Sequence, residues 1–203
     1  VLGMLHLLSA TSLSEAQAEY AKGATDSALA LLDIFNDILD LTRVRANRLS
    51  LVPAVFSPAE LAADLRSGFE VRARAKGLNL RFVSGLVSED RLLGDAGRVR
   101  QVLRALLDSA MRCTDGREIT VEAQFLPAVT PDGSAGARLV FMVLDSGLGL
   151  APGRLPDFFR PGLKEGAAPL PGSGGLGLGL ALARCLAGVL GAELCLAGEA
   201  GQG

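Results

Sequence analysis

The apolar positions between residues 15 and 48 repeat with the period of one long helix. They recur alternately three and four positions apart, which places them on a single helical face. They are Ala21, Ala24, Ala28, Leu31, Phe35 and Ile38, with Leu32 and Leu39 widening the stripe. Residues 1–9 have the pattern of another helix end, and the turn between contains Ser14 and Gln17 at capping-box spacing. We therefore predict a helical hairpin in residues 1–50, with its first helix truncated at Val1.

The apolar stripe on the long helix is too broad to be buried by a hairpin alone. A second copy of the chain would cover it and give a dimeric four-helix bundle through residues 1–48. The alternative is that the hairpin packs onto the rest of its own chain. The heptad-like spacing favours the dimer.

From residue 51 onward the pattern alternates between strand and helix periods. Ser57, Pro58 and Glu60 mark the start of a helix that ends at Gly77, and a second helix is predicted over Asp95–Cys113. Strand-like stretches occupy residues 49–56, 78–85, 118–126, 137–145 and 192–199. A further helix follows the glycine-rich residues 174–180. Residues 51–203 are thus predicted to form a mixed α/β domain in which adjacent strands run antiparallel.

Composition excludes several classes of function. Apolar residues make up 49% of the 203 residues, enough for a core, and the net charge is −2, so no basic field attracts nucleic acid or an anionic membrane. The three cysteines form no C-x-x-C pair and there is one histidine, which argues against a zinc site and suits a reducing compartment. No apolar run reaches membrane-spanning length and no signal peptide is recognisable, so we expect a cytoplasmic location without membrane contact.

The stretch "LDSGLGL" (144–150) ends a predicted strand with a carboxylate. Gly147 and Gly149 follow Asp145 at D-x-G-x-G spacing. A carboxylate here can accept a hydrogen bond from an exocyclic amine, and glycines let a flat ring approach the backbone. The alternative is an ordinary turn, since Asp-Ser-Gly is also turn chemistry.

The stretch "GGLGLGL" (174–180) leads directly into a helix. Free backbone amides at a glycine turn and at a helix start attract phosphate. A flexible loop before a helix is the alternative. The stretch matches neither the Walker pattern nor a dinucleotide fingerprint that follows a strand.

The order of these motifs, with "PDFFRP" (156–161) between them, resembles the nucleotide-binding domain of sensor histidine kinases, within the wider histidine kinase, DNA gyrase and heat-shock chaperone (GHKL) ATPase superfamily. "EYAKGATDSALALLDIFNDILDLTRVRANRLSL" is similar to the second helix of hybrid-type kinases, and "LLGDAGRVRQVLRALLDSAMRCTDGREITV" to the family's asparagine-bearing segment. The resemblance covers essentially the whole chain. It implies an α+β fold: a dimerisation and phosphotransfer hairpin (1–50) followed by a GHKL-type α/β sandwich that binds ATP (51–203).

The resemblance also implies roles for individual residues. Asp145 would accept the adenine amine, and Gly147 and Gly149 would wall the adenine pocket. Phe158 and Phe159 would lie at the base of a lid formed by residues 162–174, with Pro161 ending their segment. Three glycines would present amides to the phosphates: Gly175, Gly177 and Gly179. Arg112 would contribute positive charge to the phosphates.

The chain departs from the family at the helix over Asp95–Cys113. The asparagines that hold Mg²⁺ in the family fall at Ala105 and Ser109, and the following lysine at Arg112. Ser109 is then the one remaining side-chain metal ligand, with a hydroxyl in place of an amide carbonyl. Leu176 replaces the usual threonine of the glycine motif. The resemblance implies that adenine binding is retained while Mg²⁺ and phosphate binding are weakened.

The function implied is an ATP-dependent protein histidine kinase of a two-component system. The acceptor histidine would precede Val1, and the phosphoryl group would pass on to an aspartate of a response regulator's receiver domain. His6 matches a non-catalytic position and is expected to pack in the bundle. The alternative is a degenerate kinase that acts as a regulatory binding module or as a phosphatase or phosphotransfer scaffold. The hairpin disfavours a gyrase-type clamp, and Cys113, Cys185 and Cys195 are predicted to be core residues.

Overall fold

The computed structural model describes residues 1–114, 118–129, 133–147, 149, 159 and 178–199. The chain forms two compact units, Val1–Leu49 and Ser50–Gly203. Among the described residues, no helix combines the length with the apolar character that crossing a bilayer requires.

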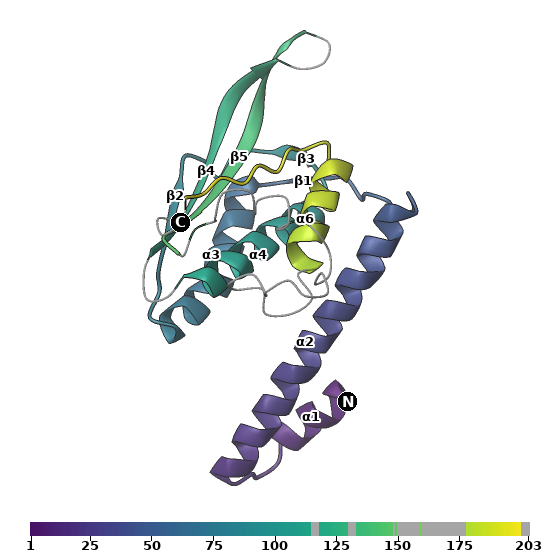
Figure 1. Ribbon diagram of the computed structural model, residues 1–203, viewed down its shortest axis with the longest axis vertical. Helices are drawn as coiled ribbons and strands as arrows, with labels where there is room; N and C mark the ends of the chain where they lie inside the picture. The colour runs from purple at the N-terminus through teal and green to yellow at the C-terminus, as the bar shows by residue number, and fades with distance from the viewer. Residues whose placement is uncertain (115–117, 130–132, 148, 150–158, 160–177, 200–203) are drawn as a thin grey trace. The chain divides into compact units, whose positions relative to one another are not determined.

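The first unit is a helical hairpin of α1 (Leu2–Ser9) and α2 (Glu15–Arg45) (Figure 1). The predicted capping box is confirmed. Ser14 Oγ accepts a hydrogen bond from the Gln17 amide at 3.3 Å, and Gln17 Oε1 accepts one from the Ser14 amide at 2.9 Å. This reciprocal pair satisfies two of the amides that a helix start leaves without partners.

The apolar stripe of α2 is mostly uncovered within the hairpin. Ala21 is buried, but Leu31 is 68% exposed and Phe35 56% exposed. His6, in the last turn of α1, is also exposed, so the packing predicted for it is not found in the hairpin itself. Because α1 is only 8 residues long, it lacks the length to cover a 31-residue helix.

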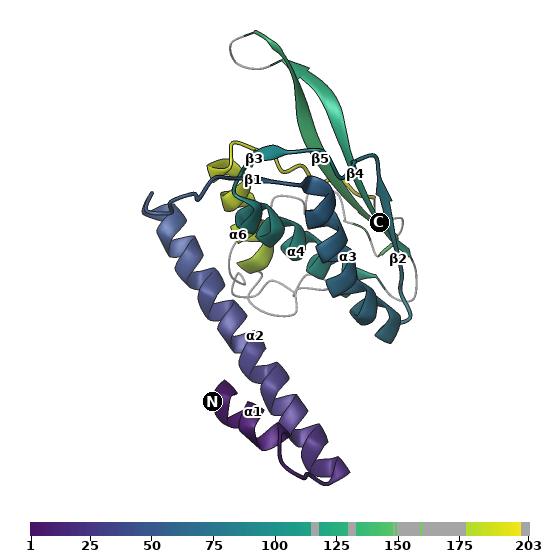
Figure 2. The same ribbon diagram turned by 180° about the vertical axis from the view of Figure 1, so that it is seen from behind.

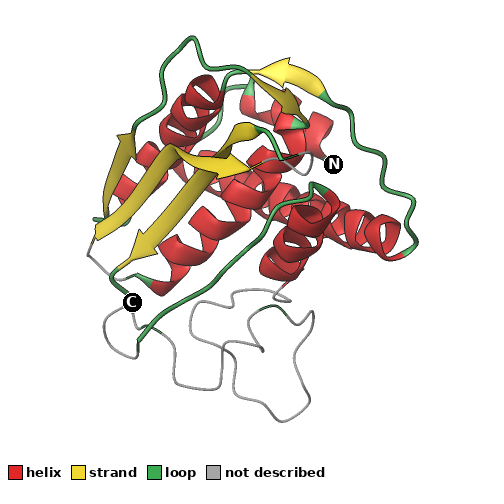
Figure 3. Ribbon diagram, turned by 90° about the horizontal axis from the view of Figure 1, so that it is seen from above, coloured by secondary structure: helices red, strands yellow, loops and turns green. Residues whose placement is uncertain are grey.

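The second unit contains five strands and three helices among its described residues (Figures 1 and 2). In chain order they are β1 (Ala54–Phe56), α3 (Pro58–Ala75), β2 (Asn79–Ser84), β3 (Leu92–Gly94), α4 (Ala96–Cys113), β4 (Glu118–Val129), β5 (Ala135–Asp145) and α6 (Leu178–Val189). The strands make two sheets, an antiparallel β1–β3 pair and a three-stranded sheet in the order β2-β4-β5. Figure 3 shows the three-stranded sheet as a layer against the helices.

Both predicted helix starts in this unit are confirmed. Ser57 caps α3 by accepting the Glu60 amide at 3.4 Å, with Pro58 at the first helical position. Asp95 caps α4 by accepting the Arg98 amide at 3.0 Å, and its other oxygen accepts the Val52 amide at 2.9 Å. Asp95 thereby ties the segment before β1 to the beginning of α4.

Two strand predictions are wrong. β4 and β5 pair antiparallel as expected, but β2 and β4 run parallel. The reason is that α4 lies between them in sequence and acts as a crossover that returns the chain in the same direction. Residues 192–199, predicted as a strand, form no ladder with the described strands. Alternating apolar residues show that one side of a segment is apolar, but they provide no pairing partner.

The core of the second unit lies between α3, α4 and the sheet. Apolar residues four apart on each helix point inward, and β4 contributes from the sheet. The buried cluster includes Leu61, Leu65 and Phe69 of α3, Leu103, Leu107 and Met111 of α4, and Ile119 and Val121 of β4. This packing fixes the rotation of α4 and so decides which of its other side chains face the candidate site.

Candidate nucleotide-binding site

Asp145 is the last residue of β5 and lies opposite Ile119, which is fully buried. The next residue, Ser146, is fastened to the start of β4. Its amide donates to the Glu118 carbonyl at 3.3 Å, and its Oγ accepts from the Glu118 amide at 3.2 Å. The turn that follows Asp145 is therefore held by the sheet.

The two oxygens of the Asp145 carboxylate have different surroundings. Oδ1 accepts the Gly147 amide at 2.9 Å and faces the Thr114 hydroxyl at 3.5 Å. The hydrogen bonds described for this carboxylate both involve Oδ1. Since a carboxylate oxygen accepts but never donates, Oδ2 can receive an N–H from a ligand.

Gly147 is required by the closeness of its surroundings. A Cβ at this position would lie 2.5 Å from the Cys113 carbonyl oxygen and 2.6 Å from Asp145 Oδ1. No side chain fits there. Gly149 adopts φ +62°, a backbone conformation that favours glycine. The expected glycine wall is consistent with this geometry, because the backbone here carries no side chain that would project over a flat ligand.

The end of α4 meets the Asp145 turn. Cys113 is half-buried, and burial together with the Asp145 charge raises the pKa of its thiol, while Arg112 and a hydrogen bond from the Ser109 side chain act in the opposite direction. Cys185 is also half-buried, but Cys195 is exposed, so the prediction that it is a core residue is wrong.

The residues at the family's metal-binding positions offer few side-chain ligands for Mg²⁺. Ala105 carries none, and Ser109 offers a single hydroxyl. Asp108 pairs with α3, where its Oδ1 lies 2.7 Å from Arg72 Nη2. Among the residues that the structure describes, no three His, Cys, Asp or Glu side chains cluster as a metal site would need. Mg²⁺ takes oxygen ligands from protein, water and phosphate, so a helix with one hydroxyl at these positions contributes little to holding it.

The first turn of α6 lies against α4. A Cβ built on Gly179 would be 3.8 Å from the Ala105 Cβ, so the structure brings these two positions together. Phe159 contacts α6 as well, with its ring centroid 5.0 Å from the Arg184 guanidinium carbon. Phe158, Pro161, Gly175, Leu176, Gly177 and the predicted lid of residues 162–174 lie outside the described residues.

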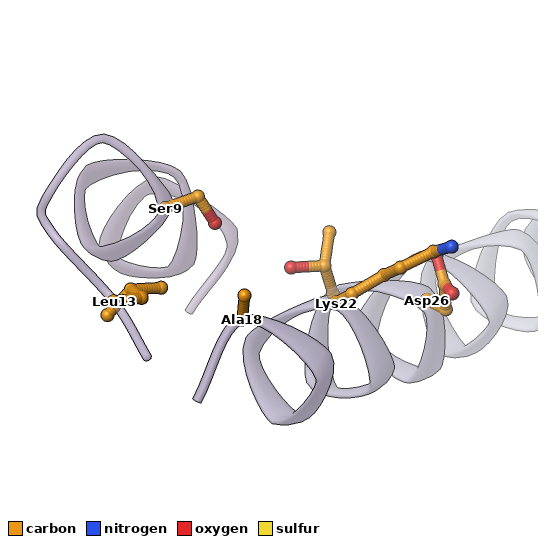
Figure 4. Close-up of a pocket in the computed structure, with 6 residues that line it drawn as sticks. Ser9, Leu13, Ala18, Lys22 and Asp26 are labelled. Carbon is orange, nitrogen blue, oxygen red and sulfur yellow. The ribbon is translucent and has the colours of Figure 1, made fainter. Parts of the chain in front are cut away.

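The hairpin contains a separate pocket of about 280 Å³ (Figure 4). It lies where α1 ends and α2 begins, and it contains none of the predicted nucleotide-binding residues. Its lining is Ser9, Leu13, Ala18, Lys22, Thr25 and Asp26.

Sequence reasoning missed Thr114, which follows α4 and is only 3% exposed. The position of this threonine in the sequence could have indicated its role. A hydroxyl directly after an amphipathic helix must find a hydrogen-bond partner if it is buried. The identity of that partner, a carboxylate 31 residues away, could not be derived from the local pattern.

Several known proteins are similar to this chain in sequence. Residues 94–203 match the family described as histidine kinase-, DNA gyrase B- and HSP90-like ATPase. The autoinducer 2 sensor kinase/phosphatase LuxQ of Vibrio cholerae is 30% identical over 203 residues, covering 100% of this chain and 23% of that protein. The virulence sensor protein BvgS of Bordetella bronchiseptica is 32% identical over 210 residues, which cover 100% of this chain and 16% of that protein. The chain thus spans less than a quarter of the curated relatives it matches here.

A solved structure shares both the fold and part of the sequence. Full-length ShkA in complex with AMPPNP is 28% identical, with a TM-score of 0.74, over 100% of this chain and 40% of that one. This likeness covers the helical hairpin as well as the α/β unit. The chain belongs to the histidine kinase-, DNA gyrase B- and HSP90-like ATPase family.

Proposed function

We propose that this chain binds ATP through Asp145 and is the nucleotide-binding core of a cytoplasmic protein histidine kinase. The observation that carries the proposal is the Asp145 carboxylate, in which the two described hydrogen bonds, from the Gly147 amide at 2.9 Å and the Thr114 hydroxyl at 3.5 Å, both go to Oδ1. An oriented acceptor beside bare backbone suits the amine edge of adenine. The wall at Gly147 and Gly149 then leaves room for the purine ring.

The phosphates would extend from this point along α4. Cys113 contacts the Gly147 turn and Ala105 contacts Gly179, so α4 joins both ends of the proposed site. Eight residues of helix measure about 12 Å, a distance that a nucleotide can span. The amides at the start of α6, Gly175 and Gly177 before it, and the Arg112 charge would then interact with the phosphates.

The reaction would transfer the γ-phosphoryl group of ATP to a histidine upstream of Val1, leaving ADP. A response regulator's receiver aspartate would accept the group next. In phosphoryl transfer the protein mainly supplies positioning and charge. The second unit would thus position the nucleotide, and the hairpin would carry the acceptor helix.

The hairpin is proposed to dimerise through residues 1–48. Its stripe exposes large apolar side chains, Leu31 and Phe35 most of all. Full burial of one such side chain contributes about 1.5–3 kcal/mol. Sedimentation should show a dimer that Phe35→Glu dissociates and Ala30→Glu leaves intact, because Ala30 is exposed and lies about 140° around α2 from Phe35. A wild-type monomer at high micromolar concentration would remove this proposal.

A degenerate kinase is the second candidate, and one observation favours it. The helix that should supply amide ligands for Mg²⁺ offers Ala105, the single hydroxyl of Ser109, and an aspartate paired with Arg72. Such a protein would still bind adenine nucleotides but would act as a regulatory module or as a phosphatase or phosphotransfer scaffold.

Calorimetric titration of the chain with a non-hydrolysable ATP analogue, with and without Mg²⁺, tests both candidates. Binding strengthened by Mg²⁺ supports the kinase, whereas binding indifferent to Mg²⁺ supports the degenerate form. Asp145→Asn should abolish binding, because an amide nitrogen or a weaker acceptor replaces the carboxylate oxygen. Asp33→Asn, on the exposed surface of α2, is the charge-matched control. Absence of binding at millimolar nucleotide, or full affinity in Asp145→Asn, would overturn the site.

A further inference from the structure

Thr114 is a buried polar residue at the point where α4 ends. It is 3% exposed, its amide donates to the Ala110 carbonyl at 3.0 Å, and its backbone has left the helix for an extended conformation (φ −105°, ψ 124°). Helix and core contacts account for its backbone. They do not account for a hydroxyl, which costs free energy when buried unless it is hydrogen-bonded.

The partner of this hydroxyl is the carboxylate of the proposed adenine site. Thr114 Oγ1 lies 3.5 Å from Asp145 Oδ1, the same oxygen that accepts the Gly147 amide at 2.9 Å. The two donors come from different elements, one from the end of α4 and one from the turn after β5. The 3.5 Å separation is long for a hydrogen bond, and such bonds in binding sites commonly tighten when the ligand arrives.

Two donors on one oxygen determine how the carboxylate is rotated. With Oδ1 directed at Thr114 and Gly147, rotation about the Cβ–Cγ bond is restricted and Oδ2 points the other way. A carboxylate fixed in this manner accepts from the amine of adenine and repels the carbonyl oxygen that hypoxanthine carries at the same ring position. A freely rotating carboxylate discriminates less, because it can turn away from the wrong base.

We propose that Thr114 is a positioning residue that sets adenine selectivity by orienting the Asp145 carboxylate through Oδ1. The inference rests on the proposed binding of adenine by Asp145. It assigns to Thr114 a role in choosing the base, beyond ending α4 and filling space beneath the sheet.

The test compares the dissociation constants of ADP and IDP, which differ at the base position that Asp145 would recognise. The variants of the full chain are Thr114→Val, which keeps the shape without the hydroxyl, Thr114→Ala, which lacks it in a smaller side chain, and Thr114→Ser, which restores it. Partial unfolding weakens both nucleotides by the same factor, so the IDP/ADP ratio reports the site alone even in a less stable variant.

We expect the wild-type chain to prefer ADP, the Val and Ala variants to lose about tenfold of that preference, and the Ser variant to retain most of it. If the wild type prefers ADP and the Val and Ala variants keep the full ratio, Thr114 is only structural and the inference fails alone. If the wild type binds neither nucleotide, the proposed function fails with it. A Ser variant that behaves like Val would also overturn the inference, because the hydroxyl would then not be the active group.

Discussion

Replacing Gly147 by alanine should damage both the stability of the α/β unit and its nucleotide site. The new Cβ would lie 2.5 Å from the Cys113 carbonyl oxygen and 2.6 Å from Asp145 Oδ1, whereas real Cβ contacts essentially never fall under 3.0 Å. The turn or the end of α4 must therefore move by about half an ångström, and overpacking of this kind costs about 1–3 kcal/mol. One of the groups that must move is the Asp145 carboxylate, which we propose binds adenine.

Differential scanning calorimetry of the full chain measures the stability effect, since it can follow the α/β unit's transition. For a unit of this size, about 1–3 kcal/mol lowers the melting temperature by roughly 2–12 °C. ADP affinity should fall at least about tenfold, because the Oδ1 contacts no longer fit. Gly68→Ala is the matched control, because its Cβ meets nothing within 4 Å in the middle of α3.

The control should raise stability by about 0.5–1 kcal/mol, since alanine loses less backbone entropy in a helix than glycine does. A Gly147→Ala protein as stable as the wild type, with unchanged ADP affinity, would refute the close packing of this turn against α4. A loss of the same size in Gly68→Ala would show that the calorimetric effect does not report the site.

Four further outcomes follow from individual contacts. Burial raises the pKa of Asp95, but hydrogen bonds from the backbone amides of Val52, Arg98 and Gly97, together with the Arg98 charge, lower it below its ordinary 3.8. Asp95→Ala should therefore cost about 1–2 kcal/mol at neutral pH, and urea unfolding should show the difference from wild type shrinking as the pH falls through that lowered pKa. Asp108→Ala should cost at most about 1 kcal/mol, because its ion pair is partly exposed, and should leave nucleotide titrations with and without Mg²⁺ unchanged, whereas a Mg²⁺-dependent loss would make it a ligand after all. The double substitution Ala105→Asn and Ser109→Asn should make the ADP affinity measured by calorimetry depend on Mg²⁺. An ADP affinity that Mg²⁺ does not change would contradict the inference that these two positions lack the ligands for the metal. Cys113, with its raised pKa, should react with a thiol reagent more slowly than the exposed Cys195. Bound ADP should slow the reaction of Cys113 further, as a mass-spectrometric time course would show.

Several local features of this protein could be read without the structure because they depend on neighbours within a few residues. The Ser14–Gln17 capping box and the cap at Ser57 form as predicted, and Asp95, predicted as the first residue of a helix, caps α4 in the same way. Each of these caps involves donors and acceptors three residues apart, so the sequence alone specifies the partners.

Part of the candidate site could also be predicted from the sequence, because its residues lie within five positions of one another. The spacing of Asp145, Gly147 and Gly149 predicted a carboxylate at the end of a strand followed by bare backbone, and the structure has that turn.

Contacts between distant segments were decided by the tertiary structure. The parallel pairing of β2 with β4 depends on α4 crossing over the sheet, and no residue pattern within either strand encodes that direction. Residues 192–199 alternate like a strand yet form no ladder with the described strands, because alternation within a segment does not supply a pairing partner.

The convergence of Thr114, Cys113 and Gly147 on the Asp145 carboxylate is the same kind of result. Sequence alone determined the chemistry available at each of these positions: a hydroxyl, a thiol, a bare amide and an acid. Only the packing of α4 on the sheet brought them together, because burial of the apolar faces of α3, α4 and β4 sets the helix position, and the polar groups at its end follow.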